Sequence, residues 1–488
     1  MNKLLKFQKE AIQFIDSKRP PVKAGYGIIG DECGLGKTID TIMLSYIHLD
    51  EGSFLIVCTA SMKLKWAREI KKWTGEEAYI IYGEKTNELP EAKFYIINYH
   101  ILGKENSLDR QAETVHKNMF KKLERKRELA CYANKEKFKK SKYKPFTIRL
   151  EGWIDELSKA HIIGIFPDEA HRLANDQAIW TKCFITLFDS IKPKIFVPLS
   201  GTITRKRTRN LFTILNLTAP AIFNNKYRFL YRYCDPVKTP FGWNWDGSSN
   251  EKELHKLLNK VMIRRLKKDV TGLPPRIFSV LPMELTKIES KNYSSASKEF
   301  KKIILEEEQN SLKIKNGYAR LKQLAYLAKR NSVFNWIDEY LEDNDKLVIA
   351  AWHKTVISDL YTKYKEVCVK IDGSVSGKKR QLAEDRFQTD SKIKIIILQI
   401  EAGGEGLTLT ASNAIAIIEC PDTPGQLIQV SDRIHRIGQE SDTVTIYFPF
   451  ANGTIENKIA DEIETSWESM ETIMDGKKDG GLFKYGFK

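Results

Sequence analysis

The sequence predicts an α/β protein built from two lobes, each a parallel sheet flanked by helices. Its 488 residues exceed what one ordinary hydrophobic core accommodates, so we expect more than one domain. Ten short apolar runs are typical of buried strands, and a helical pattern follows most of them. Strands that are buried on both faces and separated by helices form parallel sheets. The runs fall into two sets, which place one lobe at residues 1–205 and the other at 340–465.

The expected strands follow each other in chain order. In the first lobe the runs are GYGIIG (25–30), SFLIVCTA (53–60), KFYIINY (93–99), HIIGIFPDEAH (161–171) and PKIFVPLSGT (193–202). In the second they are DKLVIAAW (345–352), EVCVKIDG (366–373), SKIKIIILQ (391–399), AIAIIEC (414–420) and TVTIYFPF (443–450). Between the lobes, residues 206–339 show apolar spacings of three and four, which predict helical protrusions and a linker. Residues 466–488 are expected to form the end of a C-terminal helix and a flexible tail.

A basic insertion interrupts the first lobe at about residues 104–150. Its core, residues 116–149, holds 13 Lys and Arg against three Glu, with aromatic residues between them. Such a segment favours contact with nucleic acid, through Lys139, Lys140, Lys142 and Lys144, because cations bind phosphates and aromatic rings stack on bases. The alternative is a solvated pair of surface helices.

Composition limits the kinds of partner and compartment. A net charge of +16 and a pI near 9.2 indicate a polyanionic partner such as nucleic acid, or lysines that only keep the chain soluble. The seven cysteines form no C-x-x-C pair, so we expect neither zinc nor a disulfide framework, and a reducing compartment. The N-terminus does not resemble a signal peptide, and no apolar run is long enough to span a membrane. These features predict an intracellular protein, cytoplasmic or, in a eukaryote, nuclear.

GDECGLGKTID, residues 30–40, resembles a phosphate-binding loop with one irregularity. Gly36, Lys37 and Thr38 fit the second half of the pattern G-x-x-x-x-G-K-[ST], but Asp31 stands where its first glycine belongs. The segment lies between an expected strand and an expected helix, where backbone N–H groups can face phosphates. Lys37 would contact the β- and γ-phosphates and the Thr38 hydroxyl would bind Mg²⁺.

Two carboxylates follow the apolar run IIGIFP. Asp168 and Glu169 therefore lie at the carboxyl end of a strand, where open α/β sheets bind their ligands. Asp168 can hold Mg²⁺ through water, and Glu169 can polarise an attacking water. An acidic pair at a strand end is common, but its position after a phosphate-binding loop favours the catalytic interpretation.

A third motif, QVSDRIHRIGQ (429–439), contains two arginines that share one face if the segment is helical. Arg433 and Arg436 could stabilise charge that develops on a γ-phosphate. An arginine contributed by the second lobe would make hydrolysis depend on closure of a cleft, as in a motor. The alternative is a helix that uses these arginines for surface ion pairs.

In this order, DECGLGKT, DEAHRL, LSGT, EAGGEGLTLTA and DRIHRIGQ resemble the Swi/Snf-type ATPases of helicase superfamily 2. The resemblance extends from Gln8 to about Ile459 and implies two RecA-like lobes that hydrolyse ATP with Mg²⁺. In that family Asp-Glu precedes the G-x-G-K-T core, so Asp31 is an expected residue. Stretch 231–270 most resembles the annealing-helicase branch.

The resemblance also implies roles for individual residues. Gln8 would recognise adenine, and Asp31, Gly34, Gly36, Gly404 and Gly406 would line the ATP site. Coupling of hydrolysis to movement would involve His171, Ser200, Thr202 and Gln429. Thr59, Ser61 and Thr408 would contact the DNA backbone. Three departures, namely Ile203, Ala174 and Glu405, bear on coupling and on the grip on DNA.

Two activities follow as expectations, with a third from another class. The first is a DNA-dependent ATPase that translocates on double-stranded DNA without base readout. The second is a helicase that unwinds or reanneals branched DNA in phage or viral replication, recombination or repair, together with replication or recombination proteins. The third is a nucleotide-gated binding module whose hydrolysis is dispensable, which the presence of Lys37, Glu169 and Arg436 disfavours.

Overall fold

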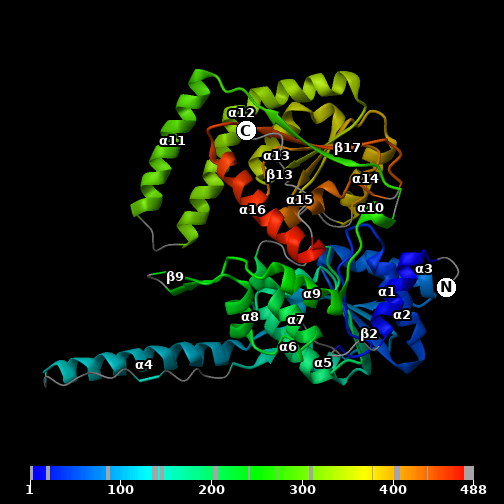
Figure 1. Ribbon diagram of the computed structural model, residues 1–488, viewed down its shortest axis with the longest axis vertical. Coiled ribbons are helices and arrows are strands. Elements are labelled where there is room, and N and C mark those ends of the chain that lie inside the picture. The colour runs from blue at the N-terminus through cyan, green and yellow to red at the C-terminus, as the bar shows by residue number, and fades with distance from the viewer. Residues whose placement is uncertain are drawn as a thin grey trace. The chain divides into compact units, whose positions relative to one another are not determined.

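The computed structural model describes residues 4–17, 22–83, 88–133, 141–142, 148–201, 207–239, 242–270, 272–306, 311–375, 377–400, 407–436 and 438–476 (Figure 1). Two compact units result, one formed by Met1–Asp40 with Leu199–Lys488 and one by Thr41–Pro198. The boundary between them falls inside helix α2 (Lys37–Ile47). No helix in the described parts of the chain is long and apolar enough to cross a membrane.

The unit Thr41–Pro198 is built on a five-stranded sheet in which every pair is parallel, in the order β3-β4-β2-β7-β8. Its strands are β2 (Ser53–Cys58), β3 (Ala78–Ile80), β4 (Phe94–Asn98), β7 (Ile162–Pro167) and β8 (Ile195–Phe196), and its shorter helices are α3 (Lys63–Thr74), α5 (Ile154–Lys159) and α6 (Ile179–Ile191). Phe54 stacks on Phe94 and on Phe166, with both pairs of ring centroids 5.7 Å apart. These fully buried rings tie the three central strands into one core.

In the described part of the basic insertion the chain forms one long helix, α4 (Ser107–Ala133), which extends from its unit in Figure 1. A short antiparallel ladder of β5 (Lys104–Glu105) and β6 (Leu150–Glu151) joins its two ends to the unit. One side of the helix is held by the returning chain, where Asp109 accepts hydrogen bonds from the backbone and guanidinium of Arg149 at 2.8–3.1 Å. On the same side Glu124 accepts the Ser141 N–H at 2.8 Å.

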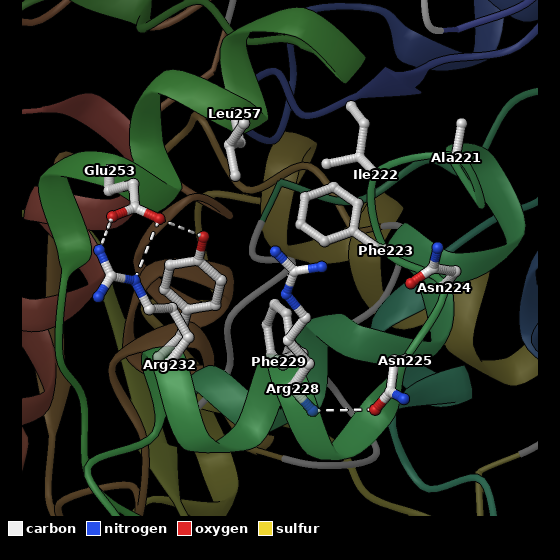
Figure 2. A pocket seen from close by; sticks show the side chains of 11 residues that line it. Ala221, Ile222, Phe223, Asn224, Asn225, Arg228, Phe229, Arg232, Glu253 and Leu257 are labelled. Carbon is white, nitrogen blue, oxygen red and sulfur yellow. Dashed lines mark hydrogen bonds and ion pairs between the residues drawn. The ribbon is translucent and has the colours of Figure 1, made fainter.

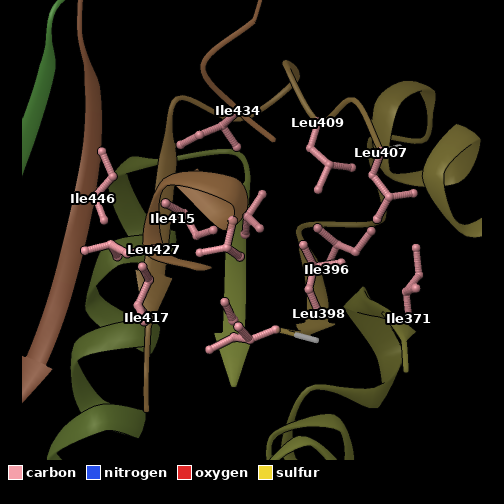
Figure 3. Packing of buried hydrophobic residues seen from close by; sticks show 14 of the residues in the cluster. Ile371, Ile396, Leu398, Leu407, Leu409, Ile415, Ile417, Leu427, Ile434 and Ile446 are labelled. Carbon is pink, nitrogen blue, oxygen red and sulfur yellow. The ribbon is translucent and has the colours of Figure 1, made fainter. Parts of the chain in front are cut away.

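The other unit is built on a six-stranded sheet whose pairs are all parallel, in the order β12-β17-β16-β13-β15-β14. The strands are β12 (Arg276–Pro282), β13 (Leu347–Ala351), β14 (Cys368–Ile371), β15 (Ile395–Gln399), β16 (Ala414–Ile417) and β17 (Val444–Phe450). Figure 3 shows their side chains packed with Leu427 and Ile434, both fully buried. Burial of each such side chain is worth about 1.5–3 kcal/mol.

The remaining elements of this unit are mostly helical. The helices are α1 (Lys6–Asp16), α7 (Phe212–Thr218), α8 (Lys226–Tyr233), α9 (Glu251–Val261), α10 (Lys267–Val270), α11 (Lys287–Glu306), α12 (Ser311–Asp343), α13 (Lys354–Lys363), α14 (Gly377–Thr389), α15 (Pro424–Ser431) and α16 (Ile455–Asp475), and the short strands are β1 (Ile28–Ile29), β9 (Val237–Thr239), β10 (Gly242–Asn244) and β11 (Met262–Ile263). All ten apolar runs contain a strand, so the predicted α/β class with two parallel sheets is confirmed.

Candidate nucleotide site

The phosphate-loop segment lies between β1 and α2. Gly34 and Gly36 have φ angles of +96° and +89°, which favour glycine because a Cβ is strained there. Helix α2 begins at Lys37, whose ammonium donates to the carbonyls of Asp31 at 2.7 Å and Glu32 at 3.2 Å. The lysine therefore curls over its own loop, as a residue that contacts phosphates bound there must.

Gln8 lies against this loop although it is distant in sequence. Its buried side chain accepts the Leu5 N–H at 3.0 Å through Oε1. A Cβ built on Gly36 would lie 2.6 Å from Gln8 Nε2, closer than Cβ contacts occur. Glycine at position 36 thus allows both the positive φ and the close approach of the glutamine amide.

A strap of six residues, Met262–Lys267, runs along the phosphate loop; we call it the arginine strap. β11 pairs with β1 in parallel, and the Arg265 carbonyl accepts the Glu32 N–H at 3.1 Å. Arg265 donates to the fully buried Asp31 carboxylate through its backbone N–H at 2.9 Å, through Nε at 3.0 Å and through Nη2. Asp31 therefore anchors the loop to the strap instead of facing solvent.

The other side chains of the strap extend this network. Arg264 donates to the carbonyls of Gly30 at 2.8 Å and Gly201 at 3.2 Å, and forms an ion pair with Asp475 of α16. Lys267 donates to Asp432 at 2.7 Å and to the His435 carbonyl at 2.6 Å. One short segment thus joins the phosphate loop to the motif that carries the two arginines.

Asp40, in the first turn of α2, adds a second buried carboxyl group. Its Oδ2 lies 3.7 Å from Arg265 Nη2. Burial, and then the charge of Asp31, raise the pKa of Asp40 well above its ordinary value, although Arg265 and Lys37 oppose the shift. Its surroundings therefore disfavour the ionised form relative to an exposed aspartate.

The two arginines lie on a turn and not on a helix, so the helical prediction for this motif is wrong. Helix α15 ends at Ser431. The chain turns there because Lys267 binds both the Asp432 carboxylate and the His435 carbonyl, and a helix would use that carbonyl internally. Burial tends to raise the pKa of Asp432, but the charges of Lys267 and Arg276 outweigh it, and the net shift is downward.

The turn brings Arg436 to the phosphate loop. A Cβ on Gly34 would lie 3.7 Å from Arg436 Cγ, which is ordinary van der Waals contact. Arg436 donates to the Asp432 carbonyl at 2.9 Å and to the Thr408 hydroxyl at 3.3 Å, and burial followed by the charge of Arg433 lowers its pKa to about 10. Arg433 is buried, and its Nε has no hydrogen-bond partner among the described residues. Arg436 therefore lies beside the loop that carries Lys37, and the charge of Arg433 acts on it.

The unit Thr41–Pro198 holds the acidic pair at the end of β7. Asp168 accepts the indole N–H of Trp66 at 2.8 Å and the Glu169 N–H at 2.9 Å, while its backbone carbonyl accepts the Tyr99 hydroxyl at 2.6 Å. Glu169 has a φ of +50°, and its carboxylate lies 3.1 Å from Nδ1 of the buried His171. The pair is thus held in a fixed geometry by neighbouring side chains.

Family models match nearly all of the described chain. The model of the SNF2-related domain matches residues 7–335, and that of the helicase conserved C-terminal domain matches residues 332–438. The chain belongs to the SNF2-related family.

Similar proteins carry the same core. The "DNA annealing helicase and endonuclease ZRANB3" of Bos taurus is 28% identical over 98% of this chain and 41% of its own length. The "SWI/SNF-related matrix-associated actin-dependent regulator of chromatin subfamily A-like protein 1" of Xenopus laevis is 29% identical over 93% of this chain and 42% of its own length. The chain therefore spans about two fifths of these relatives. A solved structure, "Sulfolobus solfataricus SWI2/SNF2 ATPase core in complex with dsDNA", is 18% identical over 97% of both chains, with a TM-score of 0.42.

The other residues that the SNF2-related resemblance singled out fall in several places. The Thr59 and Ser61 hydroxyls lie 3.0 Å apart after β2, at the same sheet edge as the acidic pair after β7. The buried Ser200 donates its N–H to the Ile29 carbonyl at 3.2 Å, and Gln429 is buried in α15. Lys142 is exposed. Thr202, Gly404, Gly406, Lys139, Lys140 and Lys144 lie outside the described residues, as do Ile203 and Glu405.

The sequence analysis assigned no role to three groups that the structure places at these sites. Arg265 binds Asp31, Trp66 binds Asp168, and Tyr99 holds the Asp168 backbone. Arg265 and Asp31 are more than two hundred residues apart in the sequence, so their contact cannot be predicted from a local sequence pattern.

A separate pocket of about 390 Å³ lies among residues 221–225, α8 and α9 (Figure 2). Phe223 and Phe229 supply apolar walls, and Figure 2 shows Arg228 with its guanidinium toward the pocket. Glu253 is already engaged, because it accepts hydrogen bonds from Arg232 and from the Tyr233 hydroxyl. None of the phosphate-loop residues lines this pocket.

Proposed function

We propose that this chain is an ATP hydrolase whose turnover is stimulated by duplex DNA and drives movement along it. The observation that carries the proposal is the approach of the Arg436 side chain to Gly34 in the loop that holds Lys37. Membership of the SNF2-related family supports it. In this proposal residues 1–205 and 340–465 act as the two motor lobes, and 206–339 as protrusions and linker.

Nucleotide binding would use the groups gathered at the phosphate loop. Backbone N–H groups at the start of α2 would bind the phosphates, and Lys37 would exchange its two carbonyl partners for phosphate oxygens. Gln8, whose amide lies against Gly36, would bind the adenine edge.

Mg²⁺ fits the donor set that this chain offers. The Thr38 hydroxyl and the Asp168 carboxylate are hard oxygen donors, and Mg²⁺ in phosphate sites takes one or two carboxylates together with phosphate oxygens. When bound, the ion neutralises charge on the phosphates. The indole of Trp66 would orient Asp168 for this task.

Hydrolysis would need the acidic pair and the two arginines in addition to the phosphate loop. Glu169 would orient the attacking water, and His171, 3.1 Å away, would position that carboxylate. Arg433 and Arg436 would stabilise the charge that develops on the γ-phosphate. The buried Arg433 Nε, which lacks a partner among the described residues, supports this role, because a buried donor gains most from an anion. Ser200, Thr202 and Gln429 would couple ATP hydrolysis to movement along the DNA.

DNA would be held mainly through its phosphates. Thr59, Ser61 and Thr408 would contact the backbone, and four lysines of the insertion, Lys139, Lys140, Lys142 and Lys144, would add charge. With a net charge of +16, binding should weaken steeply with salt and vary little with sequence.

The primary test compares ATP turnover with and without duplex DNA. We expect a severalfold stimulation by duplex and a weak one by RNA; equal rates without nucleic acid would contradict the motor. A Glu169→Gln chain should still bind ATP while turnover and movement stop. Persistence of DNA remodelling in that variant would instead identify a nucleotide-gated binding module.

Branched-DNA remodelling is the second candidate, because relatives covering 98% of this chain are named DNA annealing helicases. Such an activity would suit replication, recombination or repair, including that of a phage or virus. Strand-displacement and triplex-displacement assays run side by side distinguish the two: displacement of a triplex strand alone identifies duplex tracking, whereas separation or reannealing of fork arms identifies remodelling.

A further inference from the structure

Helix α4 carries an apolar stripe that the rest of the unit leaves uncovered. Leu108, Val115, Met119 and Leu123 are 58–70% exposed, and Ala112 between them is also exposed. At about 100° per residue these five side chains occupy one sector of the helix surface. The side held by Arg149 and Ser141, through Asp109 and Glu124, is a different one. We call the five residues the α4 stripe.

The spacing within the stripe is that of a helix-packing seam. Leu108, Ala112, Val115 and Met119 are separated by four, three and four residues, which is the a/d pattern of a heptad. An exposed heptad seam fits the apolar face of a second helix, because its side chains then pack as knobs into holes. DNA offers no such apolar partner, and the stripe itself contains no aromatic ring that could stack on bases.

The charged residues around the α4 stripe indicate the charge that a partner helix should carry. Lys122 borders the stripe and Lys126 lies in line with it just past Leu123; both are exposed, with no ion pair among the described residues. The four acidic residues of α4 lie elsewhere on its circumference, at positions 109, 113, 124 and 128. A second copy of this chain would oppose these cations with its own, whereas an acidic helix would pair with them.

We propose that the α4 stripe is a docking surface for an acidic amphipathic helix of a partner protein. The stripe from Leu108 to Leu123 is about 22 Å long at 1.5 Å per residue, so the partner segment needs roughly four turns. The docking surface is independent of ATP hydrolysis, and the partner would couple through it to the DNA-bound chain.

The test uses the full-length chain and three synthetic fluorescent peptides of about 20 residues. One is a Leu/Glu heptad helix, the second its Leu/Lys counterpart, and the third a scrambled Leu/Glu sequence of the same composition. We expect the Leu/Glu helix to bind at least tenfold more tightly, by fluorescence anisotropy, than either of the others. The double variant Val115→Ser/Met119→Ser, and separately Lys122→Glu/Lys126→Glu, should each weaken binding at least tenfold.

The matched control is Lys117→Glu/Lys121→Glu, which makes the same charge change on another sector of the same helix. It should weaken binding less than twofold. Because the altered side chains are exposed, melting temperatures and DNA-stimulated ATPase should be unchanged in every variant.

Four results would overturn the proposal. They are equal affinity for the three peptides, an equal loss in the control, binding of phosphatidylserine vesicles in preference to the peptide, and a concentration-dependent dimer that the stripe variants abolish. A loss of DNA affinity or of turnover in the stripe variants would assign the surface to the motor instead.

Discussion

Replacement of Arg265 by leucine tests whether the arginine strap holds the phosphate loop in shape. The guanidinium donates two hydrogen bonds to Asp31, and the two side chains are 10% and 0% exposed. In a buried ion pair, removal of one partner lowers the free energy of unfolding by about 3–5 kcal/mol, because the other charge remains buried without a counter-ion. An exposed pair would cost far less. A loss of that size is a large part of the stability of a typical domain.

The assay has two readouts on the full-length chain. Thermal unfolding should show a fall in Tm of several degrees for Arg265→Leu, and affinity for a fluorescent ADP analogue should fall because the loop is no longer anchored. Arg265→Lys should recover only part of the Tm and of the affinity, since an ammonium cannot reproduce the planar, two-pronged donor geometry of a guanidinium. The double variant Asp31→Asn/Arg265→Leu should be more stable than Arg265→Leu alone, because it removes the stranded charge. Arg232→Leu, which breaks an exposed pair with Glu253, is the matched control and should hardly change Tm.

A Tm within one degree of wild type for Arg265→Leu would refute the reasoning. So would a double variant no more stable than the single one.

Three further predictions address other groups. Asp40→Asn should be more stable than wild type, and the difference in stability should grow as pH rises above about 4. The reason is that the pKa of Asp40 is raised in the folded state, so the unfolded chain releases this proton at a lower pH than the folded chain does. A stability difference that shrinks with rising pH would contradict this. Trp66→Phe removes the indole bond to Asp168 and should lower ATP turnover more than ATP affinity; an equal fall in both would assign Trp66 to packing. Neutralising Lys139, Lys140, Lys142 and Lys144 together should weaken DNA binding and flatten its salt dependence, and an unchanged slope would remove these lysines from the DNA interface.

Local patterns in the sequence were enough to predict the strands. Each apolar run that suggested a buried parallel strand contains one, because a strand buried on both faces needs apolar residues in succession. β3 and β12 were not predicted: each lies at a sheet edge and has no fully buried side chain, so its apolar pattern is weak. The insertion likewise gave no sign that its described part would contain a single helix of 27 residues, α4.

Long-range contacts account for what local patterns missed at the site. The spacing of Arg433 and Arg436 suggested a helix, but Lys267, from a distant segment, binds the carbonyl and carboxylate around which the chain turns. Asp31 was expected from the family motif, yet its partner Arg265 is identified only by the folded chain. The residues of the phosphate loop can therefore be predicted from the sequence, while the distant residues that stabilise the loop cannot.

The pairing of Arg264 with Asp475 ties the far end of the chain to its nucleotide end. Arg264 also donates to Gly30 and Gly201, so the last turn of α16 shares one cation with the entrance of the phosphate loop. Shortening the protein by removing that turn would leave the guanidinium uncompensated at the root of the loop. Removal of the last turn of α16 should consequently lower nucleotide affinity, although this turn is distant in sequence from the phosphate loop.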